Sequence, residues 1–437
     1  MDNTVIPTLH PDSFLAKVVQ GLPLVNRQGK ELIRQVPCQR WDPEQRRWDP
    51  TTGTIAVIDN GNDAFKGAMP MRSIPYLATK RIPTAYVPAK KIRAGEGVLT
   101  WQVNNSEQFW IGEDALDTRK AESLPVGLSH ERLGDARFQR YLAACQVELL
   151  IEAGYGQRDA AGRLMGEWQG EFDMYVSIGL PPEEVDRSGV KPGVAQALRH
   201  IFNVPFNVSR TDEDGHTTTW LIRFVELSPY AQSFASFASW YYTLDGVPID
   251  TNIVRHVTLD IGGGQFHCCE VDLIRRSNGD RPKLRMSAQQ IGDGTIVIAR
   301  GVRDALREQY YNIRLSDAEA QQALVRGTIP VGGREQEIDE IVKAVIAARA
   351  DNLYSVMLPY LQEGQSFLMF TGGGSILLAK SLYQIVSSHR KREDFFFVPR
   401  KVAPVLNAIG GLVLAQASAQ KVIAQLRVGQ DAPSGTY

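Results

Sequence analysis

The sequence predicts an α/β fold built from two related halves, because three segments share one shape and strands alternate with helices around them. Each segment has a β-rich run followed by a glycine turn that begins with Asp or Thr, and the segments span residues 55–66, 257–264 and 367–375. Alternating strand and helix signals between residues 54 and 425 are typical of α/β architecture. The ordered turns further indicate that both halves present a backbone loop of the same kind.

The individual elements follow from the spacing of apolar residues. Runs rich in β-branched and aromatic residues predict strands over residues 54–59, 109–111, 173–178, 220–226, 256–260, 265–271 and 366–370. Helical spacing predicts helices over residues 135–153, 193–201, 232–242, 294–309, 335–362, 375–388 and 407–425. Before residue 50, Asp12 and Ser13 suit the cap of a short helix. The Trp-Asp-Pro copies at Trp41 and Trp48 are typical of turns, although they could also mark a strand pair.

Composition and charge narrow the class of protein. The chain has 437 residues, enough for more than one domain, with 43% apolar and 22% charged residues. Its formal net charge of −1 gives no electrostatic footprint for nucleic acid or an acidic membrane. Because there is no secretory signal and no apolar run of membrane-spanning length, we expect a soluble cytoplasmic protein.

The four cysteines do not indicate a disulfide framework in a chain of this length. Cys268 and Cys269 are adjacent in a predicted strand, so their side chains point to opposite faces. We therefore expect no metal site formed by these cysteines and His267.

The glycine turns suit phosphate binding, because glycine reaches positive φ and lets backbone N–H groups approach an anion closely. In the first turn, residues 61–64 would present such groups, and Lys66 would add a cation. Asp59 and Asp260 end two predicted strands, where they would hold Mg²⁺ through water or orient an attacking water. Neither a Walker loop nor a dinucleotide fingerprint fits the sequence.

The ordered turns resemble those of the actin, sugar-kinase and heat-shock-chaperone ATPase superfamily. Asp59-Asn60-Gly61, with Lys66 five residues further on, is similar to the first phosphate loop of actin. Residues 259–264 resemble the second phosphate loop of the bacterial actin-like proteins, and residues 371–375 resemble their adenosine loop. Similar segments at residues 109–115, 176–181 and 404–410 narrow the resemblance to the plasmid-segregation actins of the ParM type and their archaeal relatives. The resemblance covers residues 54–425.

This resemblance implies a two-domain fold with ATP and Mg²⁺ in the cleft between two related halves. The implied nucleotide-binding residues are Asn60, Gly61, Asn62, Asp63, Ala64, Lys66, Gly262, Gly263, Gly264, Gln265, Gly372, Gly373, Gly374 and Ser375. The implied catalytic residues are Asp260, Gln232 and Asp59, with Mg²⁺ near the two aspartates. The family has an acid directly after a strand-end proline, but Tyr230 follows Pro229 here, so we expect Gln232 to position the hydrolytic water.

The resemblance also implies domain boundaries. We expect an N-terminal extension over residues 1–50, a first actin-like domain over 51–250 with a small subdomain at about 72–150, a second over 251–425 with a small subdomain at about 295–350, and a flexible tail over 426–437. The last helix is expected to return to the first domain.

The expected function is that of an ATP-hydrolysing, filament-forming actin-like protein, for plasmid segregation or another cytoskeletal task. Such a protein associates with itself head to tail. DNA segregation would require a DNA-binding adaptor, because the chain lacks a basic face of its own, and no membrane contact is expected. Two alternatives remain open: a small-molecule kinase of the same superfamily, and a non-polymerising scaffold ATPase.

Overall fold

The computed structural model describes residues 9–430 except for 27, 62, 92–98, 119–121, 123, 126–128, 161, 187–188, 275–281, 311–312, 333 and 363–365. The described chain forms two compact units. Residues 9–249 and 405–430 make the larger unit, and residues 250–404 make the smaller unit. None of the described helices combines the length and apolar character needed to cross a bilayer.

The larger unit contains a ten-stranded sheet. Its strands are β1 (Gln35–Asp42), β2 (Arg47–Asn60), β3 (Ala64–Pro70), β4 (Leu77–Pro83), β5 (Tyr86–Pro88), β6 (Thr100–Val103), β7 (Phe109–Ile111), β8 (Gln169–Leu180), β11 (Phe206–Thr211) and β12 (Thr217–Ala231). The order is β4-β3-β2-β8-β12-β11-β6-β7-β5, and β1 pairs with β2 outside this path. A separate pair joins β9 (Val185–Asp186) to β10 (Gly189–Val190).

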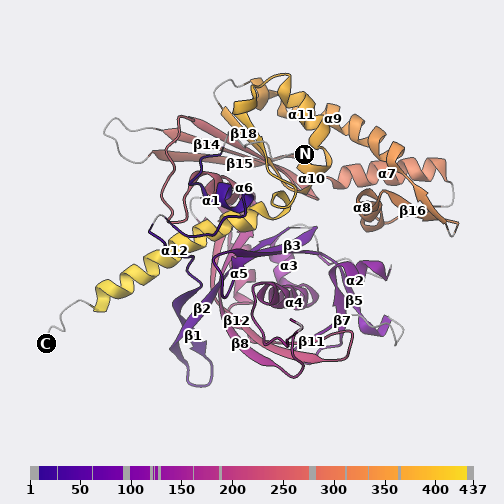
Figure 1. Ribbon diagram of the computed structural model, residues 1–437. Helices are drawn as coiled ribbons and strands as arrows, with labels where there is room; N and C mark the ends of the chain where they lie inside the picture. Colours follow the sequence, from indigo (N-terminus) through magenta and orange to yellow (C-terminus); the bar gives the residue numbers. More distant parts are fainter. Residues whose placement is uncertain are drawn as a thin grey trace. The chain divides into compact units, whose positions relative to one another are not determined.

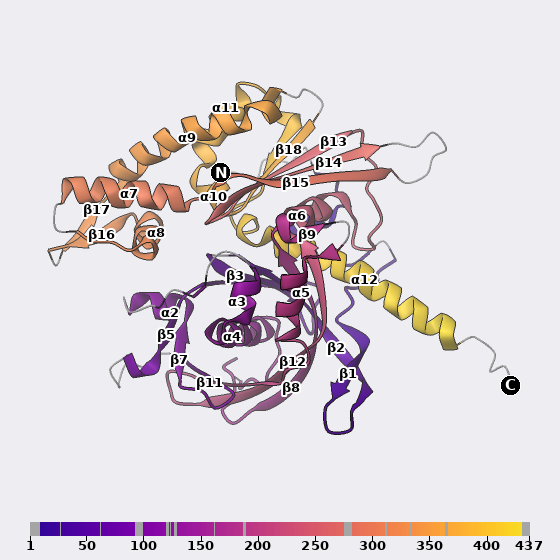
Figure 2. The ribbon, with the colours of Figure 1, turned by 180° about the vertical axis from the view of Figure 1, so that it is seen from behind.

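Helices cover both faces of this sheet. They are α1 (Phe14–Val19), α2 (Gly112–Asp117), α3 (Ser129–Gly134), α4 (Ala136–Glu152), α5 (Pro192–Arg199), α6 (Gln232–Tyr241) and α12 (Leu406–Gln430). The sheet curves around α4, which packs against β3, β4, β6 and β11 (Figures 1 and 2). Helix α12 packs against β2, β3, β8 and α6, outside this curve.

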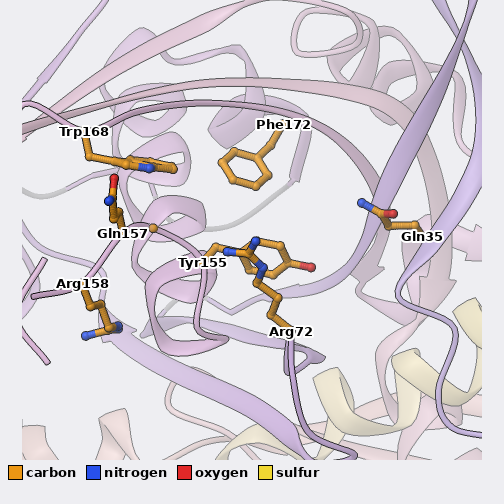
Figure 3. Close-up of a pocket in the computed structure, with 8 residues that line it drawn as sticks. Gln35, Arg72, Tyr155, Gln157, Arg158, Trp168 and Phe172 are labelled. Atoms are coloured by element: carbon orange, nitrogen blue, oxygen red, sulfur yellow. The ribbon is translucent and has the colours of Figure 1, made fainter. Parts of the chain in front are cut away.

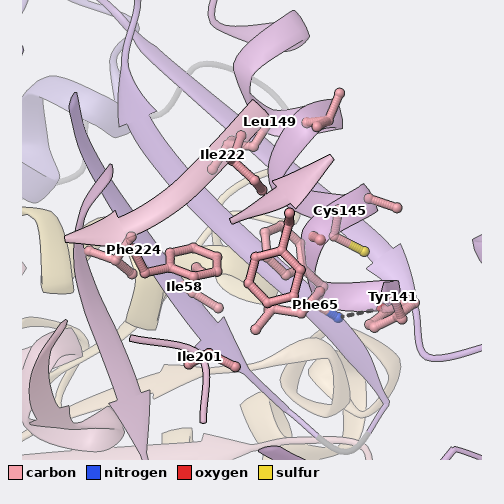
Figure 4. Close-up of a cluster of buried hydrophobic side chains, with 14 of the residues drawn as sticks. Ile58, Phe65, Tyr141, Cys145, Leu149, Ile201, Ile222 and Phe224 are labelled. Atoms are coloured by element: carbon pink, nitrogen blue, oxygen red, sulfur yellow. Dashed lines mark hydrogen bonds between the residues drawn. The ribbon is translucent and has the colours of Figure 1, made fainter. Parts of the chain in front are cut away.

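The main core of the larger unit lies between α4 and the sheet. Leu149 and Cys145 of α4 meet Phe65, Ile222 and Phe224 from the strands (Figure 4). Tyr141 of α4 also accepts a hydrogen bond from the backbone N–H of Phe65 at 3.1 Å, which ties the helix to the start of β3.

The smaller unit contains a five-stranded sheet in the order β15-β14-β13-β18-β19, with the bounds β13 (Arg255–Ile261), β14 (Gln265–Ile274), β15 (Lys283–Asp293), β18 (Ser366–Thr371) and β19 (Phe395–Phe397). Its other elements are α7 (Ile296–Gln309), α8 (Asp317–Arg326), β16 (Thr328–Val331), β17 (Arg334–Glu337), α9 (Asp339–Gln362), α10 (Gly373–Leu377) and α11 (Ala379–Ser387). Apolar residues of α9 and α11, such as Met357 and Leu382, pack with Leu259 and Phe370 of the sheet.

The two sheets repeat one five-strand pattern. In the larger unit β2, β3 and β4 are antiparallel neighbours, and β8 and β12 follow in parallel on the other side of β2. In the smaller unit β13, β14 and β15 are antiparallel neighbours, and β18 and β19 follow in parallel on the other side of β13. The predicted α/β fold with two related halves is therefore confirmed.

The N-terminal segment forms a short helix and the strand pair that was the alternative to turns. Ser13 caps α1 as predicted, since its side chain accepts a 3.1 Å hydrogen bond from the N–H of Ala16. Trp41 and Asp42 end β1, the second copy lies in β2, and Trp41 and Trp48 are cross-strand partners with ring centroids 5.4 Å apart. The strand-pair alternative is therefore confirmed, with the turn confined to residues 43–46, and paired aromatic residues across an antiparallel ladder stabilise the strand conformation.

At the other end of the chain, α12 continues to Gln430, five residues past the expected end of the helix at residue 425. The expected tail therefore begins as helix over residues 426–430. Residues 431–437 lie outside the described residues.

Candidate functional site

The first glycine turn joins β2 to β3 in the larger unit. A Cβ atom on Gly61 would lie 2.9 Å from Oδ1 of Asp63 and 3.0 Å from Nζ of Lys66, so the two charged groups lie close against this glycine. Ala64 is the first residue of β3. Asn60 ends β2, and Asn62 lies outside the described residues.

Lys66 is held by an acid within the same turn. Its Nζ lies 3.2 Å from Oδ1 of Asp63, and Nη2 of Arg81 lies 3.3 Å from Oδ2 of the same carboxylate. Burial on its own would raise the pKa of Asp63, but these two cations outweigh it and lower that pKa to about 2. Asp63 is therefore ionised near neutral pH and orients the Lys66 cation that sequence analysis assigned to phosphate binding.

Asp59 and Gln232 meet at the edge where the parallel strands of the larger unit end. Asp59 lies near the end of β2, and Gln232 is the first residue of α6, directly after β12. Gln232 Nε2 donates to Oδ1 of Asp59 at 2.6 Å and lies 3.5 Å from the carbonyl oxygen of Gly179 near the end of β8. Both side chains are buried. The structure thus brings together two of the three predicted catalytic residues.

The Tyr230 hydroxyl, two residues before Gln232, is engaged with α12. Its hydroxyl donates to the carbonyl oxygen of Asn407 at 3.2 Å, at the start of α12. Burial raises the pKa of this phenol well above its usual range, so it stays neutral. Tyr230 therefore anchors α12, while Gln232 donates to Asp59.

The second glycine turn joins β13 to β14 in the smaller unit. The carbonyl oxygens of Gly262, Gly263 and Gly264 accept hydrogen bonds from the N–H groups of Thr295, Ile296 and Gly294, at the start of α7. In the described part of the chain, no backbone hydrogen bond engages the N–H groups of Gly263 and Gly264. A turn whose carbonyl oxygens already accept hydrogen bonds, and whose N–H groups donate none to the backbone, is suited to bind an anion.

The third glycine turn lies directly against the second. Gly372 has a φ of +84°, and a Cβ atom there would lie 2.5 Å from Oδ1 of Asp260 and 2.4 Å from the carbonyl oxygen of Ile261. This close approach arises because β13 and β18 are parallel neighbours, with Asp260 paired to Thr371. Ser375 Oγ donates to the carbonyl oxygen of Gly372 at 2.8 Å, a hydrogen bond that spans the turn across Gly373 and Gly374. Asp260 is therefore packed between two glycine turns.

Gln265 does not turn toward these glycines. Its Nε2 donates to Oε1 of Gln290 on the neighbouring strand β15 at 3.0 Å. Any contact of Gln265 with a phosphate would therefore come from its backbone.

Sequence analysis missed His267 at this site. It lies directly opposite Asp260 in the β13–β14 ladder, so the two side chains share one face of the sheet. His267 is buried, and its Nε2 has no hydrogen-bond partner among the described residues. The register of a hairpin about Gly262–Gly264 was the available signal, since residues equally distant from a tight turn face each other. The neighbouring Cys268 has its pKa raised to about 12 by burial, which disfavours a thiolate metal ligand.

The carboxylates of Asp59 and of Asp260 are each chemically suited to a magnesium ion. Both are buried carboxylates at the ends of the first strands of the two repeated sheets. Magnesium prefers oxygen ligands and keeps several of its waters, so it is bound through one or two carboxylates and the phosphates of its substrate.

Known structures share this fold although their sequences differ widely. Neither a protein-family model nor a curated protein matches the sequence. A non-polymerisable quadruple mutant of pCBH ParM has a TM-score of 0.59 at 12% identity, over 83% of this chain and 98% of that chain. A 15-stranded ParM filament from Clostridium botulinum has a TM-score of 0.58 at 13% identity, over 83% and 98%. The archaeal actin homologue Ta0583, solved in complex with ADP, has a TM-score of 0.57 at 15% identity, over 84% and 99%.

The class of protein fold follows from these matches and from the repeated sheets. The chain has the actin-like ATPase fold, and the expected fold class is confirmed. Within that class it resembles the ParM proteins. At 12–15% identity these similarities concern the fold.

Proposed function

We propose that this chain is an actin-like ATPase that binds ATP with Mg²⁺ and assembles into filaments by head-to-tail self-association. The observation that carries the proposal is the repeated placement of glycine turns. The turns after β2 and β13 occupy the same position in the two related sheets, and each follows a strand whose next-to-last residue is a buried aspartate. Two such turns offer backbone donors and carboxylates of the kind that a nucleotide with its metal requires.

The residues divide into three roles. Gly61, Lys66, Gly263 and Gly264 would bind the phosphates, and Gly373 through Ser375 would lie along the adenosine. Asp59 and Asp260 would hold Mg²⁺ through its waters. Gln232 would position the hydrolytic water, since its amide is already fixed to Asp59 by a 2.6 Å hydrogen bond.

Nucleotide binding and self-association are the parts of the proposal that the similar structures support. The archaeal homologue was solved with ADP, and one ParM relative was solved as a filament. We extend both properties to this chain. A role in DNA segregation would need a DNA-bound adaptor, because the net charge of −1 provides no basic face.

Sedimentation after addition of Mg-ATP tests the proposal. We expect pelletable polymer with Mg-ATP, less with Mg-ADP, and none without nucleotide or with EDTA. Phosphate release should rise with the amount of polymer. Protein that binds ATP yet stays in the supernatant at every concentration would overturn filament formation and favour a scaffold. Transfer of the γ-phosphate to a sugar would favour a kinase.

A further inference from the structure

An open groove of about 660 Å³ lies in the larger unit (Figure 3). Its lining comes from four segments and consists of Gln35, Arg72, Tyr155, Gly156, Gln157, Arg158, Trp168 and Phe172. Trp168 and Phe172 lie at the amino-terminal end of β8, whereas Gly179 lies at its carboxyl end. Phe172 and Gly179 are therefore about 23 Å apart along the strand, at about 3.3 Å per residue. The groove is therefore separate from the carboxyl end of β8, where Gly179 lies.

The floor of the groove is aromatic and firmly built. The Trp168 ring lies 4.3 Å from the buried Trp220 ring, and the Phe172 ring lies 5.8 Å from it. Tyr155 meets Phe172 edge to face at 5.4 Å. The Trp168 ring lies across Gly170, where a Cβ atom would come within 2.1 Å of it. The apolar surface is thus held in place by packing behind it.

The rim of the groove carries cations but no acid. The Arg72 guanidinium lies over the Tyr155 ring at 5.7 Å, and Arg158 donates to the carbonyl oxygens of Gly162 and Ile151 at 2.7 and 2.9 Å. Within the described residues, neither arginine has a carboxylate partner. The lining contains no Asp or Glu. Two exposed amides, Gln35 and Gln157, complete the rim and can bond to a peptide backbone.

We propose that this groove is a docking site for an acidic peptide segment of a partner protein. An aromatic or aliphatic side chain of the peptide would pack on Trp168 and Phe172, and flanking carboxylates would pair with Arg72 and Arg158. Because guanidinium groups bind carboxylates through two parallel hydrogen bonds, they select acidic side chains. Single-stranded nucleic acid fits less well, since it needs a groove of cations along its backbone and this rim has only two. The site is independent of ATP hydrolysis.

Peptide selection on the intact protein tests the docking site. From a random displayed library, we expect enrichment of sequences in which Asp or Glu flanks an aromatic or aliphatic residue. The fluorescence anisotropy of a labelled selected peptide should then report its affinity. Arg72→Glu should weaken binding by at least about tenfold, because one charge-assisted pair is replaced by repulsion. A peptide with Lys in place of its acids should bind this variant better than it binds the wild type.

Two further variants separate the groove from general surface charge. Gly170→Ala should weaken binding by moving the Trp168 ring, while circular dichroism and thermal unfolding report an intact fold. Arg163→Glu is the matched control, because Arg163 is exposed, pairs with Asp159 and does not line the groove. The proposal is wrong if the enriched peptides lack acids or if Arg72→Glu and Gly170→Ala bind them like the wild type. It is also wrong if an oligo-dT strand, rather than a peptide, binds in an Arg72-dependent way.

Discussion

The side-chain amide of Gln232 donates a 2.6 Å hydrogen bond to Oδ1 of Asp59, although 173 positions separate the two residues in the chain. The bond forms where β2 ends and α6 begins, and both side chains are buried. Because Nε2 is committed to the carboxylate, the amide plane is fixed and Oε1 becomes a defined acceptor. An acceptor of fixed position can orient a water for attack without removing its proton fully.

Replacement of Gln232 by Ala should slow phosphate release by about a hundredfold, because the attacking water loses its orienting acceptor. ATP affinity should change little, since Gln232 is not placed on the phosphates. Single-turnover phosphate release and equilibrium nucleotide binding would measure the two effects. Gln289→Ala, at an exposed glutamine of β15, is the matched control. Equal turnover in the Gln232 and Gln289 variants would contradict the assignment.

Replacement of Asp260 by Ala should lower phosphate release while leaving nucleotide binding measurable. Asp260 lies against Gly372 and faces His267, so its carboxylate lies where the two glycine turns of the smaller unit meet. Its loss should also raise the Mg²⁺ concentration needed for half-maximal turnover, because one of two carboxylates is removed. Asp272→Ala, at the half-exposed partner of Arg255 on β14, controls for loss of one acid from the same sheet. Unchanged turnover and magnesium dependence in the Asp260 variant would refute the site.

The stability of the protein should fall between about pH 6.5 and pH 5 because of His256. Burial lowers the pKa of this histidine to about 3, whereas the unfolded chain takes up a proton near its ordinary pKa of 6.5. The neutral buried form therefore contributes fully above pH 6.5, and the contribution is lost as the pH falls toward 3. By pH 5 the loss should reach about 2 kcal/mol.

Urea unfolding at several pH values would measure this slope. His256→Phe should flatten it, whatever its effect on absolute stability, because the group that titrates on unfolding is gone. His216→Gln, at an exposed histidine of a surface turn, should behave like the wild type. A His256→Phe variant with the wild-type slope would assign the pH dependence to other groups.

The sequence predicted those parts of the fold that depend on local residue patterns. The strand predicted over residues 54–59 lies within β2, and the strand predicted over 256–260 lies within β13, because β-branched runs ending in glycine turns are local signals. The β1–β2 hairpin was predicted only as an alternative to turns, because Trp-Asp-Pro favours turns locally and the pairing of Trp41 with Trp48 favours strands. Tertiary pairing decided the outcome there.

In the candidate site, too, local patterns predicted some residues, whereas contacts between distant segments were not predicted. Lys66 and Gly61 were recognisable from spacing, but the Asp63 carboxylate that holds Lys66 depends on Arg81 from the next strand. The contact between Gln232 and Asp59 requires the order β2-β8-β12, which no local pattern specifies. Long-range partners of this kind follow from sheet order and therefore had to come from the structure.

Gly410 controls how closely α12 packs on α6. A Cβ atom there would lie 1.8 Å from the carbonyl oxygen of Ala235, which is backbone and cannot swing aside. Alanine in a helix gains about 1 kcal/mol over glycine from propensity alone, but overpacking costs about 3 kcal/mol when backbone must move. We therefore expect Gly410→Ala to lower the free energy of unfolding, measured in urea.

Gly134→Ala is the matched control, since its Cβ meets no atom within 4 Å, and it should be neutral or stabilising. If both variants were equally stable, the helices would not be in contact at Gly410. Because Asn407 of α12 accepts hydrogen bonds from Tyr230 and Ser236, displacement of α12 should also loosen the strand end that precedes Gln232.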